Sequence, residues 1–192
     1  KLNAQRKSQN LRVNFSLRKE IFFVTLGSLL GAFTMFVPRI VLDLTVGTQY
    51  YIVWLVFAKV VNSSSPTTGA VIHFFVATII GIITGIILYK GNFLNISKIS
   101  NGLLYGAIAG IVVFLVFFIP VHQFLLAPNM VQVISELDPD MTIIEAEELV
   151  EAGYVNTVID SIGTHLIWGI TVGIIASLLT RELGANYRCN IC

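Results

Sequence analysis

Charged residues are scarce in this chain of 192 residues: Asp, Glu, Lys and Arg make up only 12% of it, against ~25% in soluble domains. Hydrophobic residues make up 55%, and the mean hydropathy is +0.82. A soluble domain of this size lacks an interior large enough to bury so much apolar surface. The composition therefore excludes an ordinary soluble enzyme, a nucleic-acid-binding protein and a disordered chain, and it predicts an integral membrane protein.

Motifs that would fix a chemistry are missing as well. The sequence contains no glycine-rich phosphate-binding loop, no Gly-x-Ser-x-Gly and no His-Glu-x-x-His. No residue is therefore given a catalytic role, and the isolated chain is not expected to be an enzyme. The function must be inferred from the arrangement of the helices and from the few polar residues within them.

Four apolar stretches are long enough to cross the hydrocarbon core of a bilayer, which takes roughly 20 residues. The expected fold is all-α, an integral membrane four-helix bundle within a single transmembrane domain at residues 21–180. A basic tail, residues 1–20, precedes this domain, and a second tail, residues 181–192, follows it. The predicted spans are about residues 21–38, 69–89, 102–127 and 160–180.

Basic residues are concentrated on one side of this arrangement. Ten of the twelve Lys and Arg residues lie in the two tails and in the loop between the second and third spans, which leaves Arg39 and Lys59 on the other side. Lys and Arg accumulate in short cytoplasmic segments. The chain is therefore predicted to be a multi-pass protein of the cell membrane with both termini in the cytoplasm.

Two further segments are expected outside the spans. Residues 40–61 are apolar enough to suggest a fifth span, but a span there would conflict with the positive-inside rule, so a re-entrant or interfacial segment is predicted at residues 50–61. The outer loop, residues 128–156, is acidic and has no Lys or Arg. Asp138 and Pro139 are typical of a helix start and Gly153 of a stop, so a short surface helix is expected between them. The acidic loop is interpreted as a cation-attracting or partner-binding surface, or else as a solvated face.

Every predicted span carries glycines four residues apart. This spacing places them on one helix face, where they let two backbones approach closely in a lipid environment. The predicted helix-packing residues are Gly27, Gly31, Gly81, Gly85, Gly106, Gly110, Gly169 and Gly173.

The second and fourth spans share a longer stripe with steps of four residues. The first and third spans each place a glycine pair before a proline. This pattern predicts two tandem helical hairpins of the same orientation, and chance similarity of two apolar hairpins is the alternative. The two stripes are His73, Ala77, Gly81, Gly85 and His165, Gly169, Gly173, Ser177.

All three histidines are expected near the outer end of a span. His73, His122 and His165, together with Asp160, form a candidate site for a divalent metal, or two of the imidazoles could hold a haem. The alternative is that each imidazole separately bonds a nearby carbonyl or a lipid headgroup, with no cofactor. We expect His73 and His165 to face each other.

Cys189 and Cys192 form a Cys-x-x-Cys in the C-terminal tail. A closed zinc site needs four ligands, and this side of the chain supplies no second pair. A zinc ion would therefore have to be shared with a partner. The alternative is a pair of reduced thiols.

The layout resembles the small accessory helical subunits of archaeal ammonia monooxygenase-type complexes, which are copper membrane monooxygenases, in size, span count and Ile-, Val- and Phe-rich composition. The resemblance implies a structural role, since the Asp-x-x-x-His…His copper pattern of the catalytic-type membrane subunit is absent. The expected function is a non-catalytic integral membrane subunit that stabilises a larger membrane complex, with a monooxygenase as the class that the resemblance implies. Its expected partners are other integral membrane subunits and lipid, not nucleic acid. The alternatives are a small oligomeric transporter or channel, and a metal- or haem-binding membrane protein that uses the outer histidines.

Overall fold

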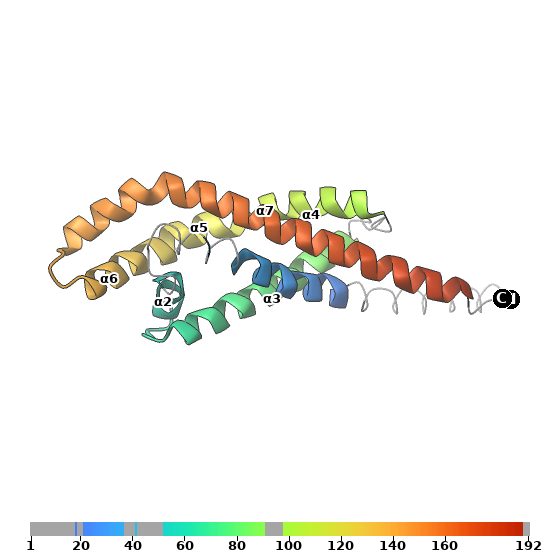
Figure 1. Cartoon of the computed structure of the whole chain (residues 1–192), viewed down its shortest axis with the longest axis horizontal. Coiled ribbons are helices and arrows are strands. Elements are labelled where there is room, and N and C mark those ends of the chain that lie inside the picture. The colour runs from blue at the N-terminus through green and yellow to red at the C-terminus, as the bar shows by residue number, and fades with distance from the viewer. Residues whose placement is uncertain (1–17, 19–20, 37–40, 42–51, 91–97, 190–192) are drawn as a thin grey trace.

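The computed structural model describes Arg18, residues 21–36, Val41, residues 52–90 and residues 98–189, with the side chains of 88–90, 180 and 182–189 excepted. Within these residues the chain is helical and has no strand, as predicted for an all-α membrane protein. The rest of the basic tail and Arg39 lie outside the described residues. The helices are a first helix (Ile21–Phe36), α2 (Ile52–Lys59), α3 (Pro66–Lys90), α4 (Ile99–Val113), α5 (Ile119–Val121), α6 (Ala127–Leu137) and α7 (Ile143–Cys189), with π-helical segments η1 (Phe114–Phe118) and η2 (His122–Leu126) (Figure 1).

The most extensive helix contact among the described residues joins α4 and α7, which run antiparallel (Figure 1). Gly106 and Gly169 oppose each other so closely that a Cβ on either one would overlap the carbonyl oxygen of the other. Gly102 and Gly173 form the same reciprocal contact one turn away. Since no side chain fits between these positions, the two backbones touch directly, and the register of the two helices is fixed.

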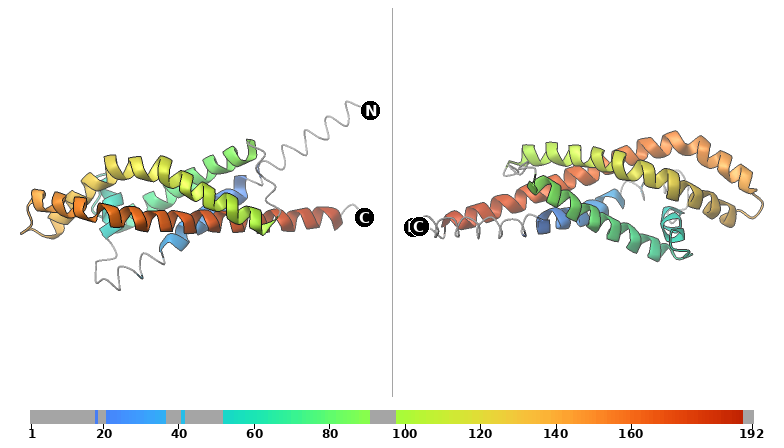
Figure 2. Two further views of the ribbon diagram at one scale, coloured as in Figure 1. Left: turned by 90° about the horizontal axis from the view of Figure 1, so that it is seen from above. Right: turned by 180° about the vertical axis from the view of Figure 1, so that it is seen from behind.

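The first helix packs on the neighbouring face of α7, also in an antiparallel direction (Figure 2). A Cβ on Gly27 would lie 3.2 Å from the backbone of Val172, and one on Gly31 would lie 2.8 Å from the ring of Trp168. Gly27 therefore lets the first helix approach the α7 backbone, and Gly31 makes room for the Trp168 ring, although neither contact is as close as the α4–α7 contact.

Another face of the first helix packs on α3. Gly81 of α3 lies against Ser28, and Gly85 lies against Val24. The Ser28 hydroxyl donates a 2.7 Å hydrogen bond to the carbonyl of Ala77, and Trp168 Nε1 donates a 3.2 Å bond to the carbonyl of Ser28. Ser28 therefore joins the first helix to both α3 and α7.

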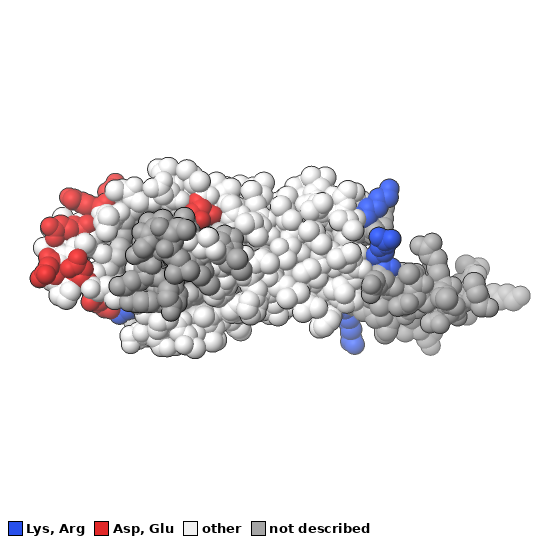
Figure 3. Space-filling model, in the orientation of Figure 1, with Lys and Arg blue, Asp and Glu red and all other residues white. Residues whose placement is uncertain are grey.

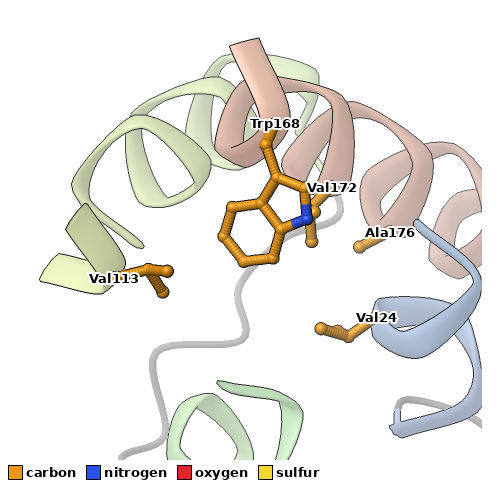
Figure 4. Packing of buried hydrophobic residues seen from close by; sticks show 5 residues of the cluster. All are labelled: Val24, Val113, Trp168, Val172 and Ala176. Carbon is orange, nitrogen blue, oxygen red and sulfur yellow. The ribbon is translucent and has the colours of Figure 1, made fainter. Parts of the chain in front are cut away.

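A cluster of small and medium side chains fills the space between these helices. Trp168 lies at its centre, with Val24, Val113, Val172 and Ala176 around the indole (Figure 4). Partly buried side chains of the first helix, α3 and α4 pack against this cluster: Met35, Ile80 and Tyr105. Residues from the first helix, α3, α4 and α7 thus share one core.

Pro120 interrupts the regular α-helix that follows α4. It lacks a backbone N–H and cannot supply the bond that an uninterrupted helix would make at this position. The chain accommodates it with the two π-helical segments, η1 before it and η2 after it, so that residues Ile99–Leu137 stay helical throughout. Two π segments close to a proline are a recognised cause of bending in a long helix.

The predicted re-entrant or interfacial segment contains a short helix, α2. It packs on α3 and on the η2–α6 region, and its long axis is steeply inclined to that of the molecule (Figure 1). Val56 of α2 contacts a buried cluster with Leu126 and Val133. Lys59 and Glu136 form an ion pair of 2.7 Å between α2 and α6. The segment is therefore helical over Ile52–Lys59, and its re-entrant or interfacial placement stays a prediction.

The predicted surface helix between Asp138 and Gly153 is wrong in its boundaries. Asp138 ends α6 and accepts the N–H of Asp140 in a turn, and the next helix, α7, begins at Ile143. Thr142 caps it, because its N–H donates to the Glu145 carboxylate while the Glu145 N–H donates to its hydroxyl. The helix then continues through Gly153 into the predicted fourth span, so no separate surface helix exists.

Apolar side chains dominate the outside of the molecule between two charged ends. Most Asp and Glu residues gather where α6 and α7 meet, and Lys and Arg gather mainly at the opposite end (Figure 3). Phe75 is 65% exposed and Phe124 79% exposed, whereas the buried hydrophobics are mostly Val and Ala. Large apolar residues outside and small ones inside are what a lipid environment favours.

Three of the described helices are long and apolar enough to cross a membrane: Pro66–Ile87, Ile99–Leu137 and Ile143–Leu179. The first helix, Ile21–Phe36, is apolar but shorter. Membrane-type helices are therefore established, whereas the four-span count stays a prediction.

The predicted tandem hairpins agree with the structure in one respect and differ in another. The stripe of α3 faces the first helix and that of α7 faces α4, so each stripe packs within its own hairpin. The glycine pairs of the two leading helices are not equivalent, however. Gly106 and Gly110 face α7 within their own hairpin, whereas Gly27 and Gly31 face α7 of the other hairpin. Helix lengths differ as well, since α3 has 25 residues and α7 has 47.

Replacing Gly169 with Ala should destabilise the protein by about 1–3 kcal/mol, because the added methyl group collides with the α4 backbone. Gly163→Ala is the matched control on the same helix, since a Cβ there meets nothing within 4 Å. Alanine at position 163 should leave stability unchanged or raise it by up to ~1 kcal/mol. Thermal unfolding in mild detergent, followed by circular dichroism, measures both. Equal midpoints for the two variants would contradict the close backbone contact.

Candidate functional site

The three histidines lie on three different helical segments, in the half of the molecule toward the acidic end. His73 is two turns into α3, His122 begins η2, and His165 lies on α7 opposite Gly110, where the glycine contact with α4 ends. Aromatic rings surround all three. This histidine layer is the candidate site.

His73 stands edge-on against a group of aromatic rings. Phe36 is stacked between Trp54 and Phe74, with ring centroids 4.3 Å and 5.3 Å away. The imidazole lies 5.5–6.0 Å from these rings and from Phe57, with the planes inclined by 60–80°. Its Nε2 atom is buried and has no hydrogen-bond partner among the described residues.

His165 and His122 are linked by one aromatic ring. Phe118 lies 5.2 Å from the His165 ring and 5.4 Å from the His122 ring, centroid to centroid. His165 Nδ1 donates a 2.7 Å hydrogen bond to the carbonyl of Ser161, which leaves its Nε2 as the acceptor in the neutral ring. His122 is 4% exposed and packs on Tyr154, and its buried Nδ1 has no partner among the described residues.

His73 and His165 lie within electrostatic range of each other, and each is half-buried among rings of its neighbours. Asp160 is half-buried on α7, more than one turn before His165. The described residues nevertheless contain no group of three His, Cys, Asp or Glu side chains that could hold a metal ion. We therefore assign no metal ligand, and the predicted four-residue site stays a prediction without geometric support.

The predicted packing glycines lie at helix contacts. Gly106, Gly110, Gly169 and Gly173 lie in the α4–α7 contact, Gly27 and Gly31 face α7, and Gly81 and Gly85 face the first helix. At Gly85 a Cβ would meet its nearest neighbours at 3.4 Å, so an alanine would fit there without a collision.

Two residues at these contacts, Ser28 and Gly69, were not predicted from the sequence. Ser28 is fully buried, as is Ser177 of the predicted α7 stripe, which lies against Gly102. Gly69 lets the Trp54 carbonyl of α2 touch α3. The available signals were a small polar residue next to Gly27 and a glycine in the first turn of the second span.

The Cys-x-x-Cys of the C-terminal tail cannot be placed. Cys192 lies outside the described residues, and the side chain of Cys189 is not described. The shared zinc site therefore stays a prediction.

Neither a family model, nor a curated protein, nor a solved structure matches this chain. The function proposed below is argued from the sequence and the geometry.

His122→Leu should leave stability unchanged or raise it by about 1–2 kcal/mol, because it removes a buried nitrogen that has no partner. His165→Leu is the matched control and should lower stability by about 0.5–1.5 kcal/mol, since it removes the bond to Ser161. Thermal unfolding in detergent measures the two variants side by side. A loss for His122→Leu larger than that for His165→Leu would show that His122 has a bound partner.

Proposed function

We propose that the chain is a non-catalytic integral membrane subunit that packs against and stabilises a larger membrane complex. The observation that supports this best is the length of two helical stretches, Ile99–Leu137 and α7. Residues Ile99–Leu137 form 39 helical residues and α7 has 47. At 1.5 Å per residue these helices are about 58 Å and about 70 Å long. A bilayer is ~30 Å thick in its hydrocarbon core and ~40–45 Å thick with its headgroups.

The excess length forms a helical hairpin at the acidic end, residues 127–159, here called the α6–α7 tip. Its side chains include large exposed apolar groups: Ile143 is 64% exposed and Ile144 68% exposed. Leu149 and Val155 are more than half exposed as well. Apolar groups that project beyond the lipid and are interleaved with carboxylates suit contact with another protein.

The interior of the α4–α7 hairpin favours a packing role over transport. A pathway through this hairpin would need space and polar lining. Backbone contact at Gly102, Gly106, Gly169 and Gly173 occupies that space instead. These contacts support the subunit proposal against the transporter alternative.

The orientation proposed for this subunit places the acidic end outside the cell and both termini in the cytoplasm. Arg18, Lys98 and Arg181 are exposed at the basic end of the described residues. At the acidic end, Lys59 is paired with Glu136. This distribution matches the positive-inside rule.

Isolation from native membranes in mild detergent tests the subunit proposal. The chain is expected to migrate with other membrane proteins, and Ile144→Gln with Leu149→Gln should release them, because both large apolar groups are exposed on the tip. Ala152→Gln, at an exposed position of the same tip, is the control and should retain them. Copper in the co-migrating fraction would indicate the class of complex that the layout resembles. A chain that runs alone or as a homo-oligomer would contradict the proposal and favour the transporter alternative.

Labelling of single cysteines tests the orientation. In a background that carries Cys189→Ser and Cys192→Ser, a membrane-impermeant maleimide should label Asp140→Cys on intact cells. It should label Lys98→Cys only after permeabilisation, because the two exposed positions lie at opposite ends of the molecule. The reverse pattern would invert the topology, and labelling of both on intact cells would contradict a spanning arrangement.

A further inference from the structure

The short helix α2 covers His73. Trp54 and Phe57 project from α2 onto the imidazole, at centroid distances of 5.5 Å each. Phe36 of the first helix and Phe74 of α3 complete the surrounding rings. The His73 imidazole fills the space between these aromatic rings. A proton that binds to the imidazole is therefore a ligand that needs no side chain to move.

Protonation of His73 would change the hydrogen-bonding needs of its ring. A neutral imidazole has one donor and one acceptor nitrogen, whereas the protonated ring has two donors and a positive charge. Nε2 is buried and has no acceptor nearby among the described residues. A proton on the ring would therefore leave either a buried N–H unbonded or a charge away from water, and both are unfavourable.

Three contacts hold α2 in place over the ring. Its backbone touches α3 where the Trp54 carbonyl meets Gly69. Val56 packs with Val133 of α6, and the Lys59–Glu136 ion pair of 2.7 Å joins the same two helices at an exposed edge. The single ion pair and the small apolar cluster contribute modestly, so the attachment of α2 to α6 is weaker than its backbone contact with α3 at Gly69.

We propose that His73 is a proton-binding site and that α2 is a cover which protonation of His73 releases. Attraction between an imidazolium and the neighbouring ring faces offsets only part of the cost of burying the charge. The covered state therefore binds the proton more weakly than the open state. By linkage, acidification shifts the population toward the open state. This proposal stands independently of the partner complex.

Other titratable groups near His73 are few. His165 of α7 lies within electrostatic range of His73, and a second proton there would add repulsion. Lys59 of α2 and Glu136 of α6 lie at the edge of the cover. The described part of the first helix has no titratable side chain, and in α3 only Tyr89 and Lys90, at the far end, accompany His73. Glu136 is the competing trigger, since its protonation would also weaken the attachment of α2.

The fluorescence of Trp54, which lies on α2, can report whether α2 covers His73. The sequence has two tryptophans, so Trp168→Phe leaves Trp54 as the single tryptophan, whose emission is excited selectively at wavelengths that the six tyrosines do not absorb. Acrylamide, a neutral quencher, measures its accessibility in the full-length protein in detergent or nanodiscs. The Stern–Volmer constant should rise about twofold or more between about pH 8 and about pH 5, the range in which histidines titrate. It should stay flat when His73→Phe is added, because phenylalanine fills the same space without titrating.

Matched variants separate His73 from its neighbours. The pH response should persist with His122→Phe and with Glu136→Gln. A flat response in the Trp168→Phe protein, or a response retained after His73→Phe, would overturn the proposal. A response abolished by Glu136→Gln would assign the switch to the ion pair instead and would overturn it too.

A second measurement avoids Trp168→Phe, which removes the hydrogen bond to Ser28. Val56 of α2 is buried against Leu126 and Val133, and Val56→Cys changes the side-chain volume little. The Val56→Cys variant is made in a background that carries Cys189→Ser and Cys192→Ser. At about pH 5 the thiol at position 56 should be labelled about twofold faster or more than in the same protein that also carries His73→Phe. Equal rates at the same pH would contradict release of α2.

Discussion

Direct contact between the backbones of α4 and α7 is the constraint on which the other packing depends. In a lipid environment the hydrophobic effect does not hold helices together, so close approach and the resulting dispersion attraction must do so. Gly106 and Gly169 permit that approach because neither has a Cβ. The contact turns Trp168 and Val172 toward the first helix, which Gly27 and Gly31 allow to come near. The register of the α4–α7 contact therefore also sets the register between α7 and the first helix.

Polar groups inside this packing fall into two kinds. Ser28 is satisfied, and its bonds connect three helices that are distant in sequence. Toward the acidic end, His73 and His122 each have a buried nitrogen without a partner among the described residues. A satisfied polar network rigidifies a core, whereas unsatisfied groups lower the cost of local opening. Ser177, which lies against Gly102, also has a buried hydroxyl without a partner among the described residues. Direct backbone contact, and not polar satisfaction, therefore distinguishes the glycine-packed half from the histidine layer.

The sequence predicted which face of each helix makes close contacts, but it did not predict which helix that face contacts. A spacing of four residues places glycines on one face through helix geometry alone, whereas the opposing helix is decided by tertiary packing, so the partner of Gly27 could not be foreseen. Gly153 failed as a stop because a glycine inside a helix costs only ~1 kcal/mol, which the long apolar helix tolerates. The true start was encoded in Thr142 and Glu145, a capping box that begins α7 one turn after Asp138 and Pro139. The depth of the histidines was predicted from the spans, whereas the aromatic rings around them come from five segments that only the fold brings together: the first helix, α2, α3, η1 and α7.

Two of the features argued above meet at α2. This helix packs on α3 beside His73, and through Val56 and Lys59 it packs on α6, which belongs to the α6–α7 tip. A protein bound to the tip and a proton bound to His73 would therefore act on the same small element. Coupling between two sites requires an element with two arrangements that both sites bias. The physical link from the tip to His73 passes through α2. This helix contacts α6 through an exposed ion pair and a small apolar cluster, so its position can change. The glycine contacts between α4 and α7 hold the remaining helices fixed.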